Sequence, residues 1–499
     1  MRLDNLLEKI EYIDYSKNND NEFTDVTNDS RKVKKGVIFV AISGMEFDGH
    51  RFIDKAIANG ANTIVITEDV TQNDDVNYIK VKDERVALAQ ISNAIFDYPS
   101  KKLRVIGVTG TNGKTTTTFM INHLLEELKS PTTIIGTNGS FISGEKYQTS
   151  NTTPEICEID KILKLSADKK IDNAVVECSS HGLYLHRLDG IEFDVAVFNN
   201  LSIEHMDFHK NMENYFDAKM ILLENAKKKI VNVDDEYGRK AKGRFEEAYT
   251  FSLENESDFK AENVELIDGK MHFELKNVKF VLNRFAMFDV YNAVAAIAAV
   301  NLLGYELKDI AKALESFTGV EARFEFVKND LGINIVIDFA HTPKAFENIY
   351  KSVPNYKRKI AVYGMSGDRT REIRHEVGKI SAENNVFSVV TTDDPKFDTY
   401  ENIADDIVSG IEEENGEFVR IKDRKSAIKH AIEIANEGDF VLLLGKGQES
   451  FIKLKGNEKT PYSEKETVNE VRKNSITSLS LFIRTNGRIS SSSQSRNNK

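Results

Sequence analysis

The 499-residue chain has very little cysteine. Cys157 and Cys178 are its only two cysteines, too few to form a disulfide framework in a protein of this length, so we expect a reducing compartment. The first fifteen residues, MRLDNLLEKIEYIDY, carry acidic side chains among the apolar ones and lack the apolar core of a signal peptide. Together these absences predict a cytoplasmic protein.

The sequence also lacks long apolar runs and an excess of positive charge. Its most apolar long stretch, 290–305, contains Asn292 and Asn301 and is too short to span a bilayer, so it predicts a buried helix and no membrane partner. The formal net charge of -12 argues against a general grip on the phosphate backbone of nucleic acid. A local pocket can still be positive and bind a small anionic substrate.

Short apolar runs alternate with helical patterns along most of the chain. This alternation predicts an α/β fold whose parallel sheets are covered by helices on both faces. At ordinary domain sizes, 499 residues predict about three domains. We place them at 1–100, 101–325 and 326–475, with 98–104 as a linker. The serine-rich segment 476–499 predicts a disordered tail.

A glycine-rich segment joins a predicted strand at 104–110 to a predicted helix at 115–129. It reads GVTGTNGKT over 107–115. Glycines let backbone N–H groups approach phosphate oxygens, and the start of the helix favours negative charge. Lys114 can then reach the β- and γ-phosphates, and the Thr115 hydroxyl can bind Mg²⁺. The usual G-x-x-x-x-G-K spacing would need glycine where Val108 stands, so the spacing that fits begins at Gly110; the alternative is a chance Gly-Lys-Thr in an ordinary loop.

The extended segment TGTNGKTTTT, 109–118, resembles the nucleotide loop of the Mur ligases and of the related ligases that add glutamate to folate. Both groups bind ATP on this loop and form an acyl phosphate. The resemblance implies a set of nucleotide-binding residues in and beside the loop: Gly110, Thr111, Asn112, Gly113, Lys114, Thr115 and Thr116.

Further segments between about 25 and 470 resemble the Mur ligases that add the third residue to the peptide of UDP-N-acetylmuramoyl-dipeptide. The resemblance implies an N-terminal UDP-binding α/β domain, a central P-loop ATPase-type parallel sheet, and a C-terminal Rossmann-like doubly wound domain that binds the amino acid. Within NDSRKVKKGVIFVAISGMEFDGHRF, 28–52, Ser30 matches a serine that contacts uridine.

Two segments that follow the phosphate loop match residues that hold the muramoyl-dipeptide. They are NTTP, 151–154, and VECSSHGLYLHRL, 176–188. Glu177 would bind Mg²⁺ together with Thr115, since a hard cation with phosphate ligands needs few protein oxygens. Hydroxyls and an arginine suit a sugar and a carboxylate, and the residues implied to contact this substrate are Thr152, Thr153, Ser179 and Arg187.

The segment NLSIEHMDFH, 200–209, has no cysteine and no standard zinc spacing. The resemblance instead places His205 near a second Mg²⁺. It also implies that Lys219 is modified by CO₂ to a carbamate, which turns a cation into an oxygen ligand for metal. An unmodified surface lysine is the alternative.

The third region carries loops that follow predicted strands, where ligands bind in doubly wound folds. By resemblance, Arg323 reaches an ATP phosphate, and the nucleotide also contacts Asn292, Asp338 and His341. Three further loops match those that hold the incoming amino acid, through Arg369, Asp393, Asp394, Lys396, Gly445 and Glu449.

Several positions depart from the family pattern. Ala286 and Asp289 replace a usual glycine and an asparagine beside the adenine, and Ala322 replaces a common glycine. Ligases that add meso-diaminopimelate usually have Asp-Asn-Pro-Arg where this chain has Asp-Asp-Pro-Lys, 393–396. Lys396 can pair with a distal carboxylate as a point charge, and the charge of Asp394 would favour an amine. The loop therefore favours meso-diaminopimelate or lanthionine over lysine or ornithine.

These segments together predict an ATP- and Mg²⁺-dependent amide ligase. It would join UDP-N-acetylmuramoyl-L-alanyl-D-glutamate to a free diamino acid in peptidoglycan biosynthesis, as a monomer. The residues expected to act in catalysis are Lys114, Glu177, His205, Lys219 and Arg323.

Two alternatives stay open. A folylpolyglutamate-type ligase would begin close to its phosphate loop, whereas about a hundred residues precede the loop here. An inactive ATP-binding scaffold is suggested only by Ala286 and Asp289.

Overall fold

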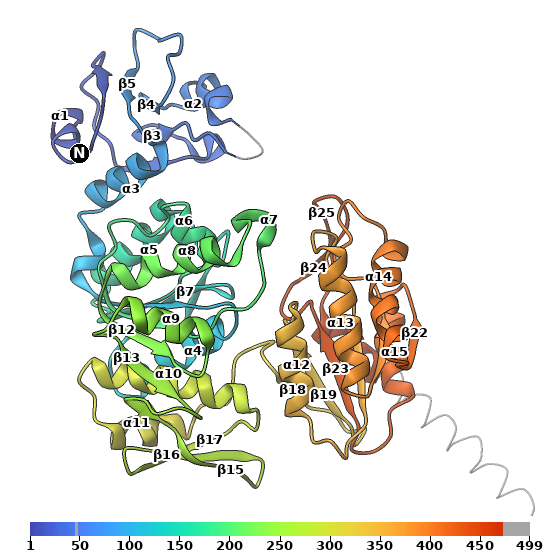
Figure 1. Ribbon diagram of the computed structural model, residues 1–499. Coiled ribbons are helices and arrows are strands. Elements are labelled where there is room, and N and C mark those ends of the chain that lie inside the picture. The colour runs from blue at the N-terminus through green and yellow to red at the C-terminus, as the bar shows by residue number, and fades with distance from the viewer. Residues whose placement is uncertain (45–47, 473–499) are drawn as a thin grey trace, which may run out of the picture. The chain divides into compact units, whose positions relative to one another are not determined.

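The computed structural model describes residues 1–44 and 48–472 (Figure 1). The chain divides into two units, Met1–Phe317 and Thr318–Lys499. The predicted α/β fold with parallel sheets is confirmed in both units. The predicted tail, 476–499, lies outside the described residues, and the predicted boundaries near 100 and 325 remain predictions.

The first unit opens with a five-stranded sheet in the order β1-β5-β4-β3-β2. β2 to β5 pair in parallel, and β1 joins β5 antiparallel. The apolar runs 36–42 and 62–67 contain the fully buried strands β3 and β4. The strands are β1 (Asp14–Ser16), β2 (Asp25–Thr27), β3 (Val37–Val40), β4 (Thr63–Ile66) and β5 (Asn77–Lys80). The helical elements are α1 (Leu3–Leu7), η1 (Ser30–Lys32), η2 (Gly49–Phe52), α2 (Ile53–Ala58) and α3 (Glu84–Ile95).

A nine-stranded sheet forms the centre of the first unit, in the order β14-β13-β12-β11-β6-β10-β7-β8-β9. It is parallel from β14 to β7, and β8 and β9 extend one edge antiparallel. β6 lies between β10 and β11, so the loops that follow these three strands meet at the carboxyl edge of the sheet. The strands are β6 (Arg104–Thr109), β7 (Thr132–Gly136), β8 (Gly139–Ile142), β9 (Glu145–Tyr147), β10 (Asn173–Glu177), β11 (Phe193–Phe198), β12 (Ala226–Asn232), β13 (Tyr249–Ser252) and β14 (Phe259–Lys260).

Helices pack around this sheet, and the most buried of them is α10. It spans Met287–Leu302 and is buried along most of its length, which confirms the helix predicted from its apolar sequence. The others are α4 (Lys114–Glu127), α5 (Ile156–Asp168), α6 (Ser180–Tyr184), α7 (Met206–His209), α8 (Met212–Glu224), α9 (Glu236–Arg244) and α11 (Leu307–Leu314). None of the helices within residues 1–44 and 48–472 combines the length and apolar character needed to cross a bilayer.

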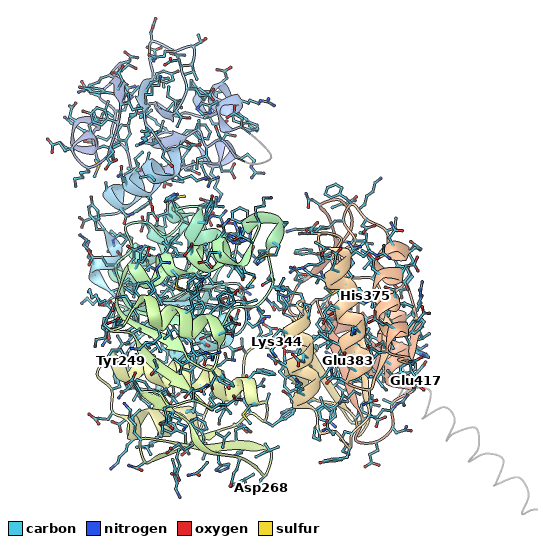
Figure 2. All side chains as sticks on the ribbon, in the orientation of Figure 1. Tyr249, Asp268, Lys344, His375, Glu383 and Glu417 are labelled. Carbon is cyan, nitrogen blue, oxygen red and sulfur yellow. The ribbon has the colours of Figure 1, made fainter. Side chains whose placement is uncertain are left out.

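A small antiparallel sheet, which the sequence analysis did not predict, follows β14. Its strands are β15 (Glu262–Ile267), β16 (Lys270–Leu275) and β17 (Val278–Leu282). Asp268 lies at the tip of its first hairpin (Figure 2).

Helix α3 packs against α5 and thereby joins the five-stranded sheet to the central one. The predicted linker contains the 3₁₀ turn η3 (Pro99–Lys102), which also packs on α5, and Pro99 is buried. Between α3 and α5, the Ser92 hydroxyl donates to Oδ2 of Asp160 at 2.6 Å, and both residues are fully buried.

The second unit contains a six-stranded sheet in the order β18-β19-β23-β20-β21-β22, parallel except for β18. Four of its strands, β19, β20, β21 and β23, consist largely of apolar residues. The strands are β18 (Glu325–Val327), β19 (Asn334–Asp338), β20 (Lys359–Tyr363), β21 (Val386–Val390), β22 (Phe418–Arg420) and β23 (Phe440–Leu444), and the hairpin is β24 (Phe451–Lys455) with β25 (Glu458–Pro461). The helices are α12 (Pro343–Ser352), α13 (Arg371–Glu383), α14 (Tyr400–Glu413) and α15 (Arg424–Glu433).

Candidate active site

The phosphate loop lies between the end of β6 and the start of α4, as predicted. Gly110 and Gly113 have φ angles of 151° and 85°, which suit glycine far better than other residues. A Cβ at Gly113 would lie 2.3 Å from Oδ1 of Asn292 on α10. The structure therefore places Asn292 directly against the loop, although the two are far apart in sequence.

The segment 199–202, which follows β11, holds the phosphate loop through hydrogen bonds. The backbone N–H of Asn112 donates to Oδ1 of Asn200 at 2.9 Å. The Thr111 hydroxyl accepts from the Ser202 N–H at 3.0 Å and lies 3.1 Å from the Tyr215 hydroxyl. Lys114 Nζ donates to the carbonyl oxygens of Gly110 and Thr111, both at 2.9 Å. The side chain of Lys114 therefore lies over the loop on which phosphate is predicted to bind.

Thr115 and Glu177 come together, as the sequence predicted for a metal site. The Thr115 hydroxyl donates to Oε2 of Glu177 at 3.0 Å. The Thr137 hydroxyl donates to the same oxygen, and its N–H donates to Oε1. A Cβ at Gly136 would lie 2.2 Å from Oε1, so only glycine leaves room for the carboxylate there. A hydroxyl and a carboxylate are oxygen donors that fit Mg²⁺.

The predicted dipeptide-binding residues lie next to Glu177. The Thr153 hydroxyl donates to the Glu177 carbonyl at 2.7 Å and accepts from the Ser179 N–H at 2.9 Å. Arg187 donates to the Thr153 carbonyl at 3.1 Å and forms an ion pair with Glu155. The Thr152 hydroxyl lies 3.0 Å from the Thr137 hydroxyl. The four predicted residues therefore form one cluster around the end of β10.

Lys219 is buried, not a surface lysine. It is 1% exposed, and its Nζ donates to the Gly110 carbonyl at 2.8 Å. Burial, aided by the nearby charge of Lys114, holds the pKa of Lys219 well below its usual range. A lowered pKa supplies the neutral amine that reacts with CO₂, so the environment suits the predicted carbamate.

His205 lies in a cluster of aromatic and histidine rings beside Lys219. Its ring centroid is 4.7 Å from that of His181 and 6.0 Å from that of Tyr215. His209 stacks on Tyr215, and burial lowers the pKa of His209 to about 4. Tyr215 connects this cluster to the phosphate loop through Thr111. Across residues 1–44 and 48–472, no three or more His, Cys, Asp or Glu side chains converge in a way that could hold a metal ion by themselves.

The departure at Asp289 has a partner in the same segment. Arg284 Nε donates to Oδ2 of Asp289 at 2.9 Å, and both side chains are buried. Asp289 therefore forms a buried ion pair with Arg284. Ala286 is also fully buried and precedes the first residue of α10.

The predicted uridine contact, Ser30, lies in η1 and is nearly buried. Its carbonyl accepts from Nδ2 of Asn59 at 2.8 Å. In η2, Nε2 of His50 accepts from the Thr67 N–H, and Nδ1 of His50 pairs with Asp48.

In the second unit, the predicted nucleotide residues gather near β19. The guanidinium of Arg323 lies 4.8 Å from the centre of the Phe339 ring. Asp338 accepts from the Phe324 N–H at 2.7 Å, and Nδ1 of His341 donates to the Phe339 carbonyl at 2.8 Å. Ala322 has a φ of 53°, a left-handed conformation that explains why glycine is common at this position.

Three loops at the carboxyl ends of β20, β21 and β23 carry the predicted amino-acid residues. A Cβ at Gly445 would lie 2.3 Å from Oδ2 of Asp393, so the second and third loops touch at these residues. Burial raises the pKa of Asp393 to about 6. The first and second loops are tied by Arg374, which donates to the Gly367 carbonyl at 2.9 Å and to Asp398 at 2.8 Å. Arg369 lies on the first of these loops.

The charged side chains of the Asp-Asp-Pro-Lys loop form ion pairs with residues of the neighbouring loops. Oδ1 of Asp394 accepts from Nζ of Lys446 at 2.8 Å, and Lys446 is fully buried. Lys446 also pairs with Glu449. Lys396 pairs with Asp368. Asp394, Lys396 and Glu449 are therefore all paired within the protein, and their contacts with the amino acid remain predictions.

Several residues of these clusters were missed by the sequence analysis. Lys446 lies between the predicted residues Gly445 and Glu449, so its place in that loop was a signal that could have identified it. The others carry no local signal, because their contacts come from distant elements: Thr137, Tyr215 and Arg374.

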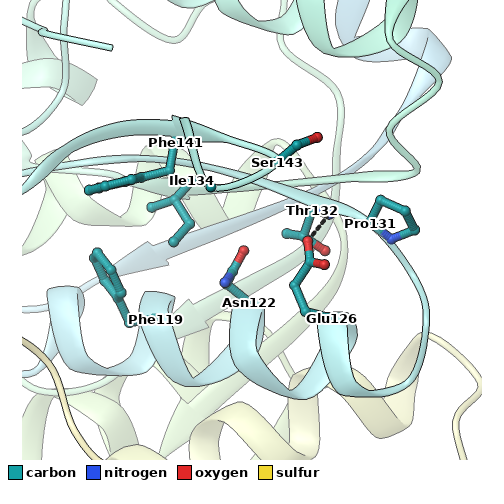
Figure 3. Close-up of a pocket in the computed structure, with 9 residues that line it drawn as sticks. Phe119, Asn122, Glu126, Pro131, Thr132, Ile134, Phe141 and Ser143 are labelled. Atoms are coloured by element: carbon teal, nitrogen blue, oxygen red, sulfur yellow. Dashed lines mark hydrogen bonds between the residues drawn. The ribbon is translucent and has the colours of Figure 1, made fainter. Parts of the chain in front are cut away.

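A shallow pocket of about 560 Å³ lies between α4 and the β7–β8 hairpin (Figure 3). Phe119, Ile134 and Phe141 form its apolar part, and Glu126 accepts from the Thr132 N–H within it. None of the predicted site residues lines this pocket.

Comparison with known proteins gives three family matches. The description "Mur ligase family, catalytic domain" matches residues 22–95, "Mur ligase middle domain" matches 108–300, and "Mur ligase, glutamate ligase domain" matches 322–447. All three predicted regions of the chain are thus matched in part.

Two relatives that match most of the chain carry the same name. The UDP-N-acetylmuramoyl-L-alanyl-D-glutamate–2,6-diaminopimelate ligase of Clostridium botulinum is 40% identical over 485 residues, 95% of this chain and 100% of the relative. Its namesake from Fusobacterium nucleatum is 35% identical, covering 90% and 94%. A solved structure of a ligase with this name has a TM-score of 0.62 at 27% identity, covering 91% and 95%. MurF from Acinetobacter baumannii, at 21% identity and a TM-score of 0.67 over 89% and 95%, shares the fold.

Proposed function

Because the chain belongs to the Mur ligase family, we propose that it is the ATP-dependent ligase that joins meso-diaminopimelate to UDP-N-acetylmuramoyl-L-alanyl-D-glutamate. The observation that carries this proposal is similarity over 95% of this chain and 100% of a relative with that name. The clustering of Lys114, Thr115 and Glu177 around the phosphate loop supports the chemistry.

The first unit would hold ATP and the acceptor. The ammonium of Lys114 neutralises phosphate charge, while backbone N–H groups at the start of α4 bind phosphate oxygens. Thr153, Ser179 and Arg187 orient the terminal carboxylate of the dipeptide, which attacks the γ-phosphate to form an acyl phosphate and ADP. Such catalysis is mostly positioning and charge neutralisation.

Thr115 and Glu177 would hold Mg²⁺, with His205 and a carbamate on Lys219 near a second ion. Mg²⁺ supplies charge neutralisation on the transferring phosphoryl group. The hydroxyl of Thr137 and the packing of Gly136 keep the Glu177 carboxylate in place.

The second unit would hold the amino acid. Its residues Arg323, Asp338 and His341 would also contact the nucleotide. The amine attacks the acyl carbon, an amide forms, and phosphate leaves. The expected contacts to the diamino acid come from residues on three loops: Arg369, Asp393, Asp394, Lys396, Gly445 and Glu449.

Phosphate release from ATP, measured with the muramoyl-dipeptide, tests this function. Meso-diaminopimelate, lanthionine, lysine and ornithine are supplied separately to the full chain. Release with diaminopimelate, abolished in Lys114→Ala while the circular dichroism spectrum is retained, is the expected result. Release with lysine alone would overturn the substrate assignment. Absence of release with all four amino acids, from a folded protein that binds ATP, would favour an inactive scaffold, and glutamate-dependent activity on folate would favour the folate-type ligase.

A further inference from the structure

We propose that Arg424 is a positioning residue for the incoming amino acid, because its buried guanidinium holds the second and third amino-acid loops at a set separation. The second loop is 391–398 and the third is 444–449. The inference rests on the proposed function, since that function assigns these two loops to amino-acid binding.

Arg424 bridges two strand ends that have no direct backbone pairing. Its Nη1 donates to the Thr392 carbonyl at 3.3 Å, and its Nη2 donates to the Leu444 carbonyl at 2.8 Å. Thr392 follows β21 and Leu444 ends β23, and β20 lies between these strands in the sheet. Strands two places apart are roughly 10 Å apart, so a side chain with a wide, planar fork of donors is suited to join them.

The guanidinium of Arg424 is itself held in place by Glu464, which in turn accepts from Tyr462. Its Nε donates to Oε1 of Glu464 at 2.9 Å, and the Tyr462 hydroxyl donates to Oε2 of Glu464 at 2.6 Å. Arg424 and Glu464 are 2% and 1% exposed. Burial alone would lower the pKa of Arg424, but the Glu464 carboxylate more than offsets this and keeps the pKa above its usual value. The fork is therefore charged and has one orientation.

The location of Arg424 is locally unfavourable for a cation. It is the first residue of α15, where the helix dipole disfavours positive charge. A buried ion pair is also rarely more stabilising than apolar side chains of similar volume. Local rules of this kind are commonly broken at functional sites, and here the side chain provides the relative placement of two loops.

That placement acts on residues proposed to bind the amino acid. Thr392 is adjacent to Asp393, and Leu444 is adjacent to Gly445. Asp393 and Gly445 are in turn close enough that a Cβ at Gly445 would meet the Asp393 carboxylate at 2.3 Å. Any change in the distance between the two carbonyls therefore moves both sides of this contact.

The test compares Arg424→Met and Arg424→Lys with Ile428→Ala in the full chain. Ile428 is a fully buried residue of the same helix that contacts neither loop through a hydrogen bond, so its truncation serves as the control for lost stability. We measure kcat, the KM for the amino acid, the KM for ATP and the melting temperature. A misplacement of about 1 Å can reduce catalysis about 100-fold. We therefore expect Arg424→Met to raise the amino-acid KM at least about tenfold, with the ATP KM unchanged within about twofold.

Arg424→Lys keeps the charge but cannot form the two-pronged contact, so its amino-acid KM should fall between those of wild type and Arg424→Met. Hydrogen exchange of 391–398 and 444–449 should be faster in Arg424→Met than in Ile428→Ala at equal melting temperature. If Arg424→Met does not fold, Glu464→Gln is used for the same measurements.

Equal effects of Arg424→Met and Ile428→Ala on the amino-acid KM and on exchange would overturn the inference. Wild-type protein that shows no amino-acid-dependent phosphate release would instead contradict the proposed function, and the exchange comparison would still decide whether Arg424 holds the loops.

Discussion

Replacing Asp160 by asparagine should stabilise the first unit at pH 8 much more than at pH 5. Asp160 is fully buried between α3 and α5, where it accepts one hydrogen bond from Ser92. Among the described residues, no donor reaches its Oδ1. Burial raises the pKa of Asp160 to about 7, because its charged form has no cation beside it.

The size of the effect follows from proton linkage. The ordinary pKa of aspartate is 3.8, so between about pH 4 and pH 7 the unfolded chain is ionised while the folded protein keeps its proton. The folded state then binds more protons, and the free energy of unfolding falls as pH rises through this window. Each pH unit corresponds to about 1.4 kcal/mol, so the two units from pH 5 to pH 7 amount to about 3 kcal/mol. An amide cannot ionise, and the advantage of Asp160→Asn should grow by this amount and stay constant above pH 7.

Hydrogen exchange of α3 and α5 peptides, followed in urea at pH 5, 6, 7 and 8 with correction for intrinsic rates, measures this local stability in the full chain. Asp168→Asn is the matched control, since Asp168 lies on the same helix but is exposed and pairs with Lys164. Its stability difference from wild type should not follow the same pH curve. An Asp160→Asn advantage that is equal at pH 5 and pH 8 would refute the assignment of a buried, unpaired acid.

Three further predictions concern the active site and its departures. Glu177→Gln should raise the Mg²⁺ concentration for half-maximal activity at least about tenfold, and an unchanged Mg²⁺ titration of phosphate release would remove Glu177 from the metal site. Because burial lowers the pKa of Lys219, its neutral amine should take up CO₂ near neutral pH. The Lys219→Ala variant should be inactive, and acetate should partly restore its activity. If the variant does not respond to acetate and the wild type does not respond to bicarbonate removal, the lysine is unmodified. Arg284→Met should lower the free energy of unfolding, measured in urea, by about 3–5 kcal/mol because it leaves Asp289 buried without its partner. The double variant Arg284→Met/Asp289→Asn should recover most of that loss. Equal losses in the single and double variants would show that the pair is not coupled.

Much of the fold and part of the site could be predicted from sequence because their signals are local. The apolar runs that became β3, β6 and β23 are continuous, and strands buried on both faces have this pattern. The three-stranded sheet from β15 to β17 was missed because its first strand is almost entirely exposed and has no apolar run. The segment 98–104 contains proline and basic residues typical of a linker, yet η3 packs on α5 because its Pro99 and Ser100 are buried.

The sequence by itself determined the phosphate loop, the order of the α/β regions and the family, since each depends on residues that are contiguous or in a set order along the chain. Only the tertiary structure decided which charged side chains are paired and which are buried. Asp394 is paired with Lys446 from another loop, and Asp289 is paired with Arg284. The resemblance implied a carbamate on Lys219, with a surface lysine as the alternative; the structure buries Lys219 against Gly110, and burial lowers its pKa. The physical reason is that charge, burial and loop separation depend on neighbours across strands, as Arg424 illustrates by joining two loops that are distant in sequence and not adjacent in the sheet.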